Sequence, residues 1–357
     1  MILVTGATGL VGSLLTLELL KRGEDVVATR RKTSNIQKLK KIFSFYVSPQ
    51  EAEVYFSRIK WRELDLLNAY QVYEVLEGID TVYHTAAVVS FTASDRDNIF
   101  NSNVEGTRNM VNAALERKIQ KFVHVSSVAS LGENPDGVIT EETYAIPDQK
   151  LSNYAKSKYY SEMEVWRAYY EGLNTIIVNP SVILGPLADW KRKVIGKVLY
   201  LVWEGLPFYI DGITGFVDVR DVVRAMIMLA DKEVFGERFI INGANLTFKQ
   251  LLDIAADVMG RPKPRYLIGD NWVKAAFWLD QIRSRVTFTD PLLTKEYIKY
   301  INIKQIFSSE KLLKTLPDFT YIPIEQTIQF VVEKFLESLS EKEKHSRNIL
   351  NLFFCGD

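Results

Sequence analysis

The chain has 357 residues, with 44 basic and 44 acidic side chains and a hydrophobic fraction of 47%. This is the composition of an ordinary globular protein, and the balanced charge gives no reason to expect nucleic acid or an anionic membrane as a partner. Cys355 is the only cysteine, so an intrachain disulfide is excluded, and nothing indicates an oxidising compartment. Three histidines and one cysteine are a poor set of ligands, and we expect no metal site.

The amino-terminal residues read as structure rather than as a targeting segment. Met1–Val4 has the pattern of a buried strand and leaves no room for a signal peptide. The apolar run at residues 198–210 is interrupted by Glu204, Gly205 and Pro207 and is too short to span a bilayer. We therefore expect a cytoplasmic protein.

Short apolar runs alternate with helical periodicity over the first half of the chain. The runs predict strands at Ile2–Thr5, Asp25–Arg30, Trp61–Leu64, Thr81–His84, Lys121–Ser126 and Thr175–Asn179. Apolar residues at helical spacing predict helices at Val11–Arg22, Ala69–Leu76, Val104–Arg117 and Tyr154–Glu171. This alternation predicts an α/β fold, in which a doubly wound parallel sheet of the Rossmann type carries helices on both faces.

The regular alternation ends near Gly185-Pro186, which suggests a second structural unit. We expect a dinucleotide-binding domain over residues 1–184 and a smaller mixed lobe for the substrate over residues 185–339. Part of residues 211–245 is expected to return to the first domain. Residues 340–357 form a charged and then apolar tail.

A glycine-rich turn follows the first predicted strand and opens the first predicted helix. Residues 5–12 read Thr-Gly-Ala-Thr-Gly-Leu-Val-Gly. Gly6 permits the tight turn, Gly9 lets a pyrophosphate approach the backbone, and Gly12 lets the helix pack on the strand. The phosphates then meet the positive end of the helix. The pattern predicts a dinucleotide site.

The end of the second predicted strand indicates which dinucleotide is preferred. An Asp or Glu there usually binds the ribose 2′-hydroxyl of NAD. Here the strand ends in Arg30 and Arg31, and Asp25 lies at its other end. Guanidinium groups suit a 2′-phosphate by charge and by their forked geometry. We therefore expect NADP(H), with NAD(H) as the alternative.

Tyr154 and Lys158 are four residues apart and share one face of a predicted helix. A free tyrosine titrates near ~10, and a neighbouring ammonium favours the phenolate and brings the pKa towards neutrality, as general acid–base catalysis requires. Ser127 precedes this pair at the end of the fifth predicted strand. We hypothesise that Ser127, Tyr154 and Lys158 are catalytic.

Together these motifs resemble the extended short-chain dehydrogenase/reductase superfamily, in its NAD-dependent epimerase/dehydratase group, from Met1 to about Leu339. Within it the chain is most similar to dihydroflavonol-4-reductase-like and 3β-hydroxysteroid-dehydrogenase-like proteins. Ser127, Tyr154 and Lys158 match the family's catalytic positions. Further matches are Asp65-Leu66, which would frame the adenine, residues 85–87 along the cofactor, and residues 180–182 beside the nicotinamide. The expected cofactor contacts are Gly6, Thr8, Gly9, Leu10, Val11, Gly12, Arg30, Arg31, Asp65, Leu66, Thr85, Ala86, Ala87, Tyr154, Lys158, Pro180, Ser181 and Val182.

The resemblance implies NADPH-dependent reduction of a ketone or aldehyde. Tyr154 would donate a proton to the carbonyl oxygen as hydride reaches the carbon. Lys158 would lower the pKa of that tyrosine and bind the nicotinamide ribose. Ser127 would donate a hydrogen bond to the same substrate oxygen.

The substrate is expected between the carboxyl edge of the sheet and the second lobe. Apolar and aromatic side chains there would suit a hydrophobic carbonyl compound or alcohol, and the candidates are Phe91, Leu131, Trp190, Trp203, Phe208 and Tyr209. Plant flavonoid reductases carry a polar specificity residue five places after the serine, where this chain has Gly132. The resemblance therefore supports the reaction class better than the substrate.

Two other functions fit the same fold. Nucleotide-sugar epimerases of the group tend to hold NAD with an acid at the end of the second strand, which Arg30 and Arg31 contradict. The dehydratases add an acidic pair after the serine, where this chain has Val128-Ala129. A non-catalytic NADP-binding regulator would typically have lost the tyrosine or the lysine, and this chain keeps both.

Three further expectations concern residues around the site. Asp221 is expected to be the N-cap of a helix and His124 a core residue of the fifth strand. Asn103 is a polar residue that we leave outside the catalytic set.

In many members of the family that the chain resembles, the helices equivalent to residues 104–117 and 154–171 pair across a two-fold axis. Their expected outer residues Met110, Trp166 and Tyr170 suggest a homodimer, with a monomer as the alternative.

Overall fold

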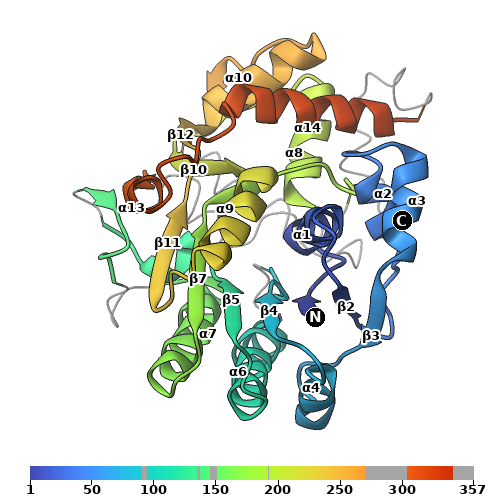
Figure 1. Ribbon diagram of the computed structural model, residues 1–357. Coiled ribbons are helices and arrows are strands. Elements are labelled where there is room, and N and C mark those ends of the chain that lie inside the picture. Colours follow the sequence, from blue (N-terminus) through green and yellow to red (C-terminus); the bar gives the residue numbers. More distant parts are fainter. Residues whose placement is uncertain (91–94, 135–136, 145–150, 192, 270–303, 341–357) are drawn as a thin grey trace.

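The computed structural model describes residues 1–90, 95–134, 137–144, 151–191, 193–269 and 304–340. Its centre is a seven-stranded sheet in the order β11-β7-β5-β4-β1-β2-β3, with every neighbouring pair parallel (Figure 1). The strand order reverses between β1 and β4, and ligands of such folds bind outside the carboxyl ends of the strands at that point. The predicted α/β fold is confirmed.

Six of the strands are the predicted ones, with bounds that agree to within one residue. They are β1 (Ile2–Thr5), β2 (Val26–Arg30), β3 (Lys60–Glu63), β4 (Thr81–His84), β5 (Lys121–Val125) and β7 (Thr175–Pro180). The seventh, β11 (Glu237–Ile241), was not predicted, and it pairs with β7 at the edge of the sheet. Their Val, Ile and Phe residues suit a sheet that is covered on both faces.

Helices cover the two faces of this sheet, and alternate strand residues pack against them (Figure 1). On β1, Val4 belongs to the core cluster under α1 (Leu10–Lys21) and α9 (Val219–Asp231). Leu3 belongs to the opposite cluster, and it packs with three other helices. These are α4 (Ala69–Val75), α6 (Gly106–Glu116) and α7 (Asn153–Tyr170).

Shorter helical elements connect these units. They are α2 (Gln37–Phe43), α3 (Pro49–Ser57), α5 (Arg96–Phe100), a π-helical turn η2 (Asn101–Glu105) and a 3₁₀ turn η3 (Val128–Leu131). Because η2 runs directly into α6, the helix predicted at residues 104–117 begins as a π-helical segment.

Small sheets and further helices make up the carboxyl-terminal part. The sheets pair β8 (Val182–Leu184), β10 (Ile213–Asp218) and β12 (Ala244–Thr247), then β9 (Phe208–Tyr209) with β13 (Tyr266–Leu267), and β6 (Val138–Ile139) with β14 (Ile306–Phe307). The helices are α8 (Val194–Trp203), α10 (Phe248–Met259), α13 (Glu310–Thr315) and α14 (Ile324–Ser338). A separate apolar cluster joins α8, α10 and α14. The domain bounds expected from the sequence stay a prediction.

The prediction that Asp221 is a helix N-cap is wrong. Asp218 caps α9, and its Oδ1 accepts the N–H of Arg220 at 2.7 Å. Asp221 lies in the first turn and accepts the backbone N–H of Ile322 at 2.9 Å. Its carboxylate therefore ties the helix to the chain that leads into α14.

The prediction that Met110 lies on an outer helix face is also wrong. The Met110 side chain is 0% exposed in the cluster beneath the sheet. The reason is that α6 packs against α4 on one side and α7 on the other, so both of its flanks are covered. Trp166 packs partly buried against the same cluster, whereas Tyr170 is exposed. The homodimer stays a prediction.

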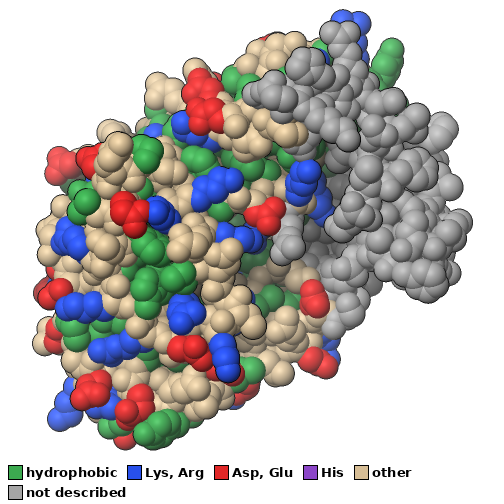
Figure 2. All heavy atoms as spheres, turned by 90° about the vertical axis from the view of Figure 1, so that its right-hand side faces the viewer, with side chains coloured by type: hydrophobic (Ala, Val, Ile, Leu, Met, Phe, Trp, Pro, Cys, Tyr) green, Lys and Arg blue, Asp and Glu red, His purple; other side chains and the backbone are tan. Residues whose placement is uncertain are grey.

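Acidic and basic side chains are interspersed over the described part of the face in Figure 2, in line with the equal numbers of the two charges. No helix among the described residues is both long enough and apolar enough to cross a bilayer. The described residues also contain no group of three or more His, Cys, Asp or Glu side chains that could hold a metal ion. The tail at residues 341–357 and Phe91 lie outside the described residues.

Candidate active site

The glycine turn between β1 and α1 has no space for a side chain at Gly6 or at Gly12. Gly6 has a φ of +66°, and a Cβ there would lie 2.7 Å from the Cα of Ala86. A Cβ on Gly12 would lie 2.4 Å from the carbonyl oxygen of Gly6 and 2.6 Å from the Oγ1 of Thr85. Strand, turn and helix therefore approach one another as closely as backbone atoms allow.

The amino end of α1 is open to an anion. Gly9 caps the helix with extended backbone, no side chain caps the first turn, and that turn contains no acid. The first N–H groups of a helix have no partner within the helix, and the helix dipole favours negative charge beside them. This glycine cradle fits the pyrophosphate of a dinucleotide.

We expect Gly12→Ala to weaken cofactor binding by about tenfold or more, because the added methyl pushes the helix away from the turn. Overpacking of this kind costs about 1–3 kcal/mol of stability. Thermal unfolding and fluorescence titration with NADPH measure the two effects. Gly269→Ala is the matched control, since a Cβ there has no neighbour within 4 Å among the described residues. Unchanged binding in Gly12→Ala would show that the turn does not hold the cofactor.

The loop after β4 is fixed by hydrogen bonds from both sides. Thr85 donates its hydroxyl to the carbonyl of Thr5 at 2.6 Å. Asn103, buried in η2, accepts the N–H of Val88 at 2.7 Å and donates to its carbonyl at 2.9 Å. The same amide nitrogen donates to Ser157 Oγ at 3.0 Å. Asn103 thus connects the loop predicted to lie along the cofactor with α7.

The predicted adenine residues follow β3 at the same edge of the sheet. Asp65 accepts the N–H of Leu67 at 3.0 Å, which closes a turn. Leu66 packs against Gly106 of α6, and its carbonyl accepts the side-chain amide of Asn109 at 2.9 Å. The segment therefore has a fixed place beside the carboxyl ends of the strands.

Arg30 and Arg31 lie at the carboxyl end of β2. Arg30 is partly buried and Arg31 is exposed. Neither guanidinium forms an ion pair or hydrogen bond with a residue in the described part of the chain. Both are therefore available to an anionic ligand.

The structure brings the three predicted catalytic residues to the end of β5. Ser127 follows the strand, and its Oγ accepts the N–H of Ala129 at 3.2 Å. Tyr154 lies in the first turn of α7, which Ser152 caps. One turn later Lys158, only 3% exposed, donates to the carbonyl of Val125 at 2.7 Å. The lysine thus anchors α7 to the strand two residues before the serine.

Burial controls the electrostatics around this lysine. Loss of solvent lowers the pKa of Lys158 to about 8, while the negative charge of Glu162 acts in the opposite direction. His84 and His124 are register partners on β4 and β5, with stacked rings 5.5 Å apart. Burial and then the charge of Lys158 lower the pKa of His84 to about 3 and that of His124 well below its ordinary value. The two rings are therefore neutral at pH 7.

The histidines differ in their hydrogen bonds. His84 pairs with Thr5 Oγ1 at 2.9 Å and with Thr107 Oγ1 at 3.2 Å. Neither ring nitrogen of His124 has a hydrogen-bond partner among the described residues. His124 is only 1% exposed, which confirms the prediction that it is a core residue of its strand.

Comparison with known proteins agrees with this geometry. A family model described as "NAD dependent epimerase/dehydratase family" matches residues 2–242. The chain belongs to this family. It is 33% identical over 267 residues to sterol demethylase protein B of Methylococcus capsulatus, covering 74% of this chain and 76% of that protein. It is 30% identical to a putative dihydroflavonol 4-reductase of Synechocystis sp., covering 78% of each chain.

Among solved structures, the crystal structure of gox2253 is 28% identical, with a TM-score of 0.76, and the match covers 94% of this chain and 98% of that one. The sequence resemblance to the extended short-chain dehydrogenase/reductase superfamily is confirmed. This member of the epimerase/dehydratase family is an NAD(P)-dependent oxidoreductase.

The segment predicted to lie beside the nicotinamide joins the main sheet to the small one. Pro180 ends β7, and the Ser181 N–H donates to the carbonyl of Ile241 at 3.1 Å. Val182 opens β8, and its side chain is 44% exposed. An exposed valine at the carboxyl edge suits the flat face of a ring.

The structure describes five of the six predicted substrate-pocket residues, and these five differ in burial. Leu131 and Trp190 are buried in apolar clusters, so their assignment to the pocket lining is wrong. Trp203 is partly covered, with the Arg261 guanidinium 3.8 Å from its ring centroid. Phe208 and Tyr209 keep exposed surface on β9. The prediction failed for Leu131 and Trp190 because irregularly spaced aromatic and aliphatic residues usually fill cores.

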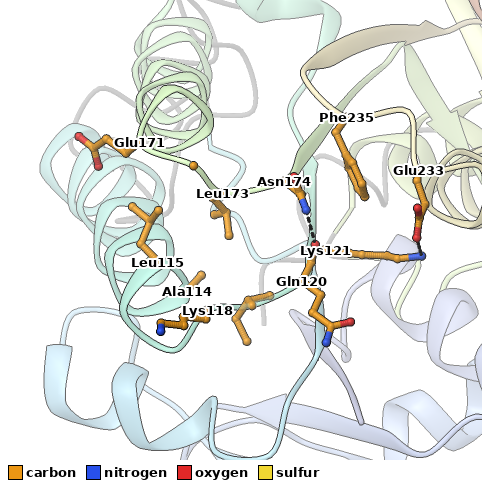
Figure 3. Close-up of a pocket in the computed structure, with 12 residues that line it drawn as sticks. Ala114, Leu115, Lys118, Gln120, Lys121, Glu171, Leu173, Asn174, Glu233 and Phe235 are labelled. Atoms are coloured by element: carbon orange, nitrogen blue, oxygen red, sulfur yellow. Dashed lines mark hydrogen bonds and ion pairs between the residues drawn. The ribbon is translucent and has the colours of Figure 1, made fainter.

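A hollow lies at the other edge of the sheet (Figure 3). It is lined by the carboxyl ends of α6 and α7 and by the residues that open β5 and β7. Within it Lys121 pairs with Glu233 at 2.8 Å, and Asn174 donates to the carbonyl of Gln120 at 3.1 Å. Ser127 and Lys158 lie at the opposite ends of these elements. The hollow is therefore separate from the candidate active site.

Two charged residues near the site were missed in the sequence. Glu162 of α7 and Arg238 of β11 form a buried ion pair at 3.2 Å. The available signal was the spacing, because Glu162 follows Lys158 by four residues and shares its helix face. Arg238 gave no signal, since it lies 76 residues away in a strand that was not predicted.

Proposed function

We propose that this chain reduces a ketone or aldehyde with NADPH, with Tyr154 as the general acid. The observation that carries the proposal is the buried Lys158, which lies one helical turn from Tyr154 and is fixed to the carbonyl of Val125, two residues before Ser127. Among the relatives, the one named as a putative dihydroflavonol 4-reductase supports the same reaction class.

The cofactor would be held by the chain's own backbone and by two arginines. Gly6, Gly9 and Gly12 leave room for the pyrophosphate at the start of α1. Arg30 and Arg31 would bind the 2′-phosphate that distinguishes NADPH from NADH. When bound, NADPH supplies the hydride.

The protein side of the reaction is proton transfer and charge stabilisation. Tyr154 would donate its phenolic proton to the substrate oxygen, and Ser127 would hydrogen-bond the same atom as negative charge develops there. The charge of Lys158 would make Tyr154 a stronger acid. The exposed Val182 and the aromatic residues of β9 favour a hydrophobic substrate.

The alternative within the family is a nucleotide-sugar epimerase or dehydratase. An epimerase returns the hydride to the same sugar, so it consumes no cofactor overall. A non-catalytic NADP-binding regulator is the alternative of another class. It would bind the cofactor without turnover.

An assay of the purified chain with NADPH separates the three. Hydrophobic ketones and aldehydes are screened by the loss of NADPH absorbance, and UDP-sugars are screened by product analysis. We expect NADPH consumption that depends on a carbonyl compound. Interconversion of UDP-sugars without net cofactor loss would contradict the proposal, and binding without any turnover would favour the regulator.

A further inference from the structure

A buried carboxylate collects hydrogen bonds behind the candidate catalytic residues. The Glu162 side chain is 1% exposed and lies on α7, which packs beside β7 (Figure 1). Its five donors come from the ends of three strands, from η3 and from its own helix. They are Ser126 Oγ at 2.6 Å, Ser130 Oγ at 2.8 Å, Asn179 Nδ2 at 2.8 Å, Arg238 Nη1 at 3.2 Å and Trp166 Nε1 at 3.4 Å.

Arg238 offsets the free-energy cost of burying the Glu162 carboxylate. A carboxylate out of water needs both hydrogen bonds and a counter-charge. Arg238 is itself buried, and it also donates to the carbonyls of Glu141 and Thr143. Its guanidinium lies 4.7 Å from the ring centroid of Tyr144. The pair therefore connects α7 with the segment at residues 141–144.

The hydrogen bonds to Glu162 enclose Ser127. Ser126 and Ser130 stand on either side of it and both donate to the carboxylate. The carbonyl of Ser127 accepts Ser130 Oγ at 2.7 Å and Asn179 Nδ2 at 3.1 Å. The backbone that carries Ser127 is thus held by groups whose other hydrogen bonds end on Glu162.

Glu162 is also the charged group that acts on Lys158 in the described part of the chain. On α7 the lysine stands between Tyr154 and Glu162, one turn from each. From β4 and β5 it is faced by His84 and His124, which are neutral at pH 7. Arg238 of β11 faces Glu162 instead. The Glu162 carboxylate therefore opposes the lowering of the Lys158 pKa by burial.

We propose that Glu162 is a positioning residue for the reaction, which fixes the segment carrying Ser127 and places a negative charge one helical turn from Lys158. The inference rests on the proposed function, since it assigns Glu162 a role through Ser127 and Lys158. Glu162 touches neither substrate nor cofactor in this assignment.

The negative charge of Glu162 determines the direction in which its removal shifts the pKa of Lys158. A negative neighbour makes proton loss from an ammonium harder, so its removal lowers the pKa of the lysine. Starting from about 8, we expect Glu162→Gln to lower the titration midpoint of Lys158 by about one unit. Glu162→Asp keeps the charge and should restore most of the difference.

The midpoint is measured by NMR on protein labelled with a carbon isotope at the lysine ε-carbon, with the Lys158 signal assigned from Lys158→Arg. Glu164→Gln is the matched control, because this carboxylate lies two residues further along α7 and pairs with Arg108 and Arg167 away from Lys158. We expect a lower midpoint in Glu162→Gln and an unchanged one in Glu164→Gln. Equal midpoints in wild type and Glu162→Gln would overturn the inference.

Glu162→Gln removes the negative partner of the buried Arg238, and the variant can fail to fold for that reason. The double variant with Arg238→Gln removes both charges of the pair, and the buried Glu141, on which Arg238 also acts, keeps the positive charge of Lys311. This double variant is still expected to lower the midpoint. With any accepted carbonyl substrate, the alkaline limb of kcat should also move to lower pH, because removal of a negative charge eases the first proton loss from the Tyr154–Lys158 pair. The NMR titration needs no substrate, so it tests the role of Glu162 even if no carbonyl reduction is found. Failure of this inference can therefore be distinguished from failure of the proposed function.

Discussion

Tyr154→Phe is expected to lower turnover by roughly 10²–10⁴-fold, the usual contribution of a positioned proton donor. The substitution removes one hydroxyl and keeps the ring, so the fold and the affinity for NADPH should change little. Steady-state kinetics with an accepted carbonyl compound, thermal unfolding and an NADPH titration measure the three quantities.

Tyr159 and Tyr160 are the matched controls on the same helix. They lie about 100° and 200° further round than Lys158, which shares the face of Tyr154. The ring centroids of Tyr159 and Tyr160 lie 5.4 Å apart, and the ring centroid of Tyr160 lies 6.3 Å from that of Phe100. Tyr159→Phe and Tyr160→Phe should leave turnover nearly unchanged. Near-full activity in Tyr154→Phe would show that the catalytic assignment is wrong.

The predictable part of the fold is the part whose signal is local. The strands from β1 to β7 are short apolar runs buried on both faces, and helices of regular amphipathic spacing follow them. The turn at Gly6–Gly12 is likewise defined by neighbours in sequence. The strand β11 was missed although Gly236 and the Asn242-Gly243 pair mark turns on either side of it. It follows β7 by more than fifty residues, with three strands of the small sheets between them, so no local pattern assigns it to the main sheet.

The errors arise where tertiary packing decides between residues that the sequence leaves equivalent. Asp218 and Asp221 both suit a helix N-cap, and only the backbone of Ile322 shows that the second has another partner. Glu162 reads as an ordinary helix carboxylate until Arg238 is brought to it from β11. Spacing along the chain therefore predicted the residues proposed to carry the chemistry, but not the buried pair behind them.

Replacing Arg30 and Arg31 together with Ala is expected to weaken NADPH binding far more than NADH binding. The two cofactors differ by the dianionic 2′-phosphate, and neither guanidinium has a partner among the described residues that would compete for it. Each lost charge-assisted contact is worth roughly 1.5–3 kcal/mol. The double variant should therefore lose about 10²-fold or more in NADPH affinity and keep most of its NADH affinity.

Dissociation constants of both cofactors, measured by fluorescence titration at one ionic strength, decide this prediction. Lys21→Ala with Lys60→Ala is the control, since it removes two surface cations at the amino edge of the sheet, where they pair with Glu18 and Asp25. The control should bind both cofactors as the wild type does, because charges beyond a Debye length of ~8–10 Å are largely screened. Equal losses for NADPH and NADH in the arginine variant would mean that these side chains do not read the 2′-phosphate. The argument for a reductase over an epimerase would then lose its cofactor support.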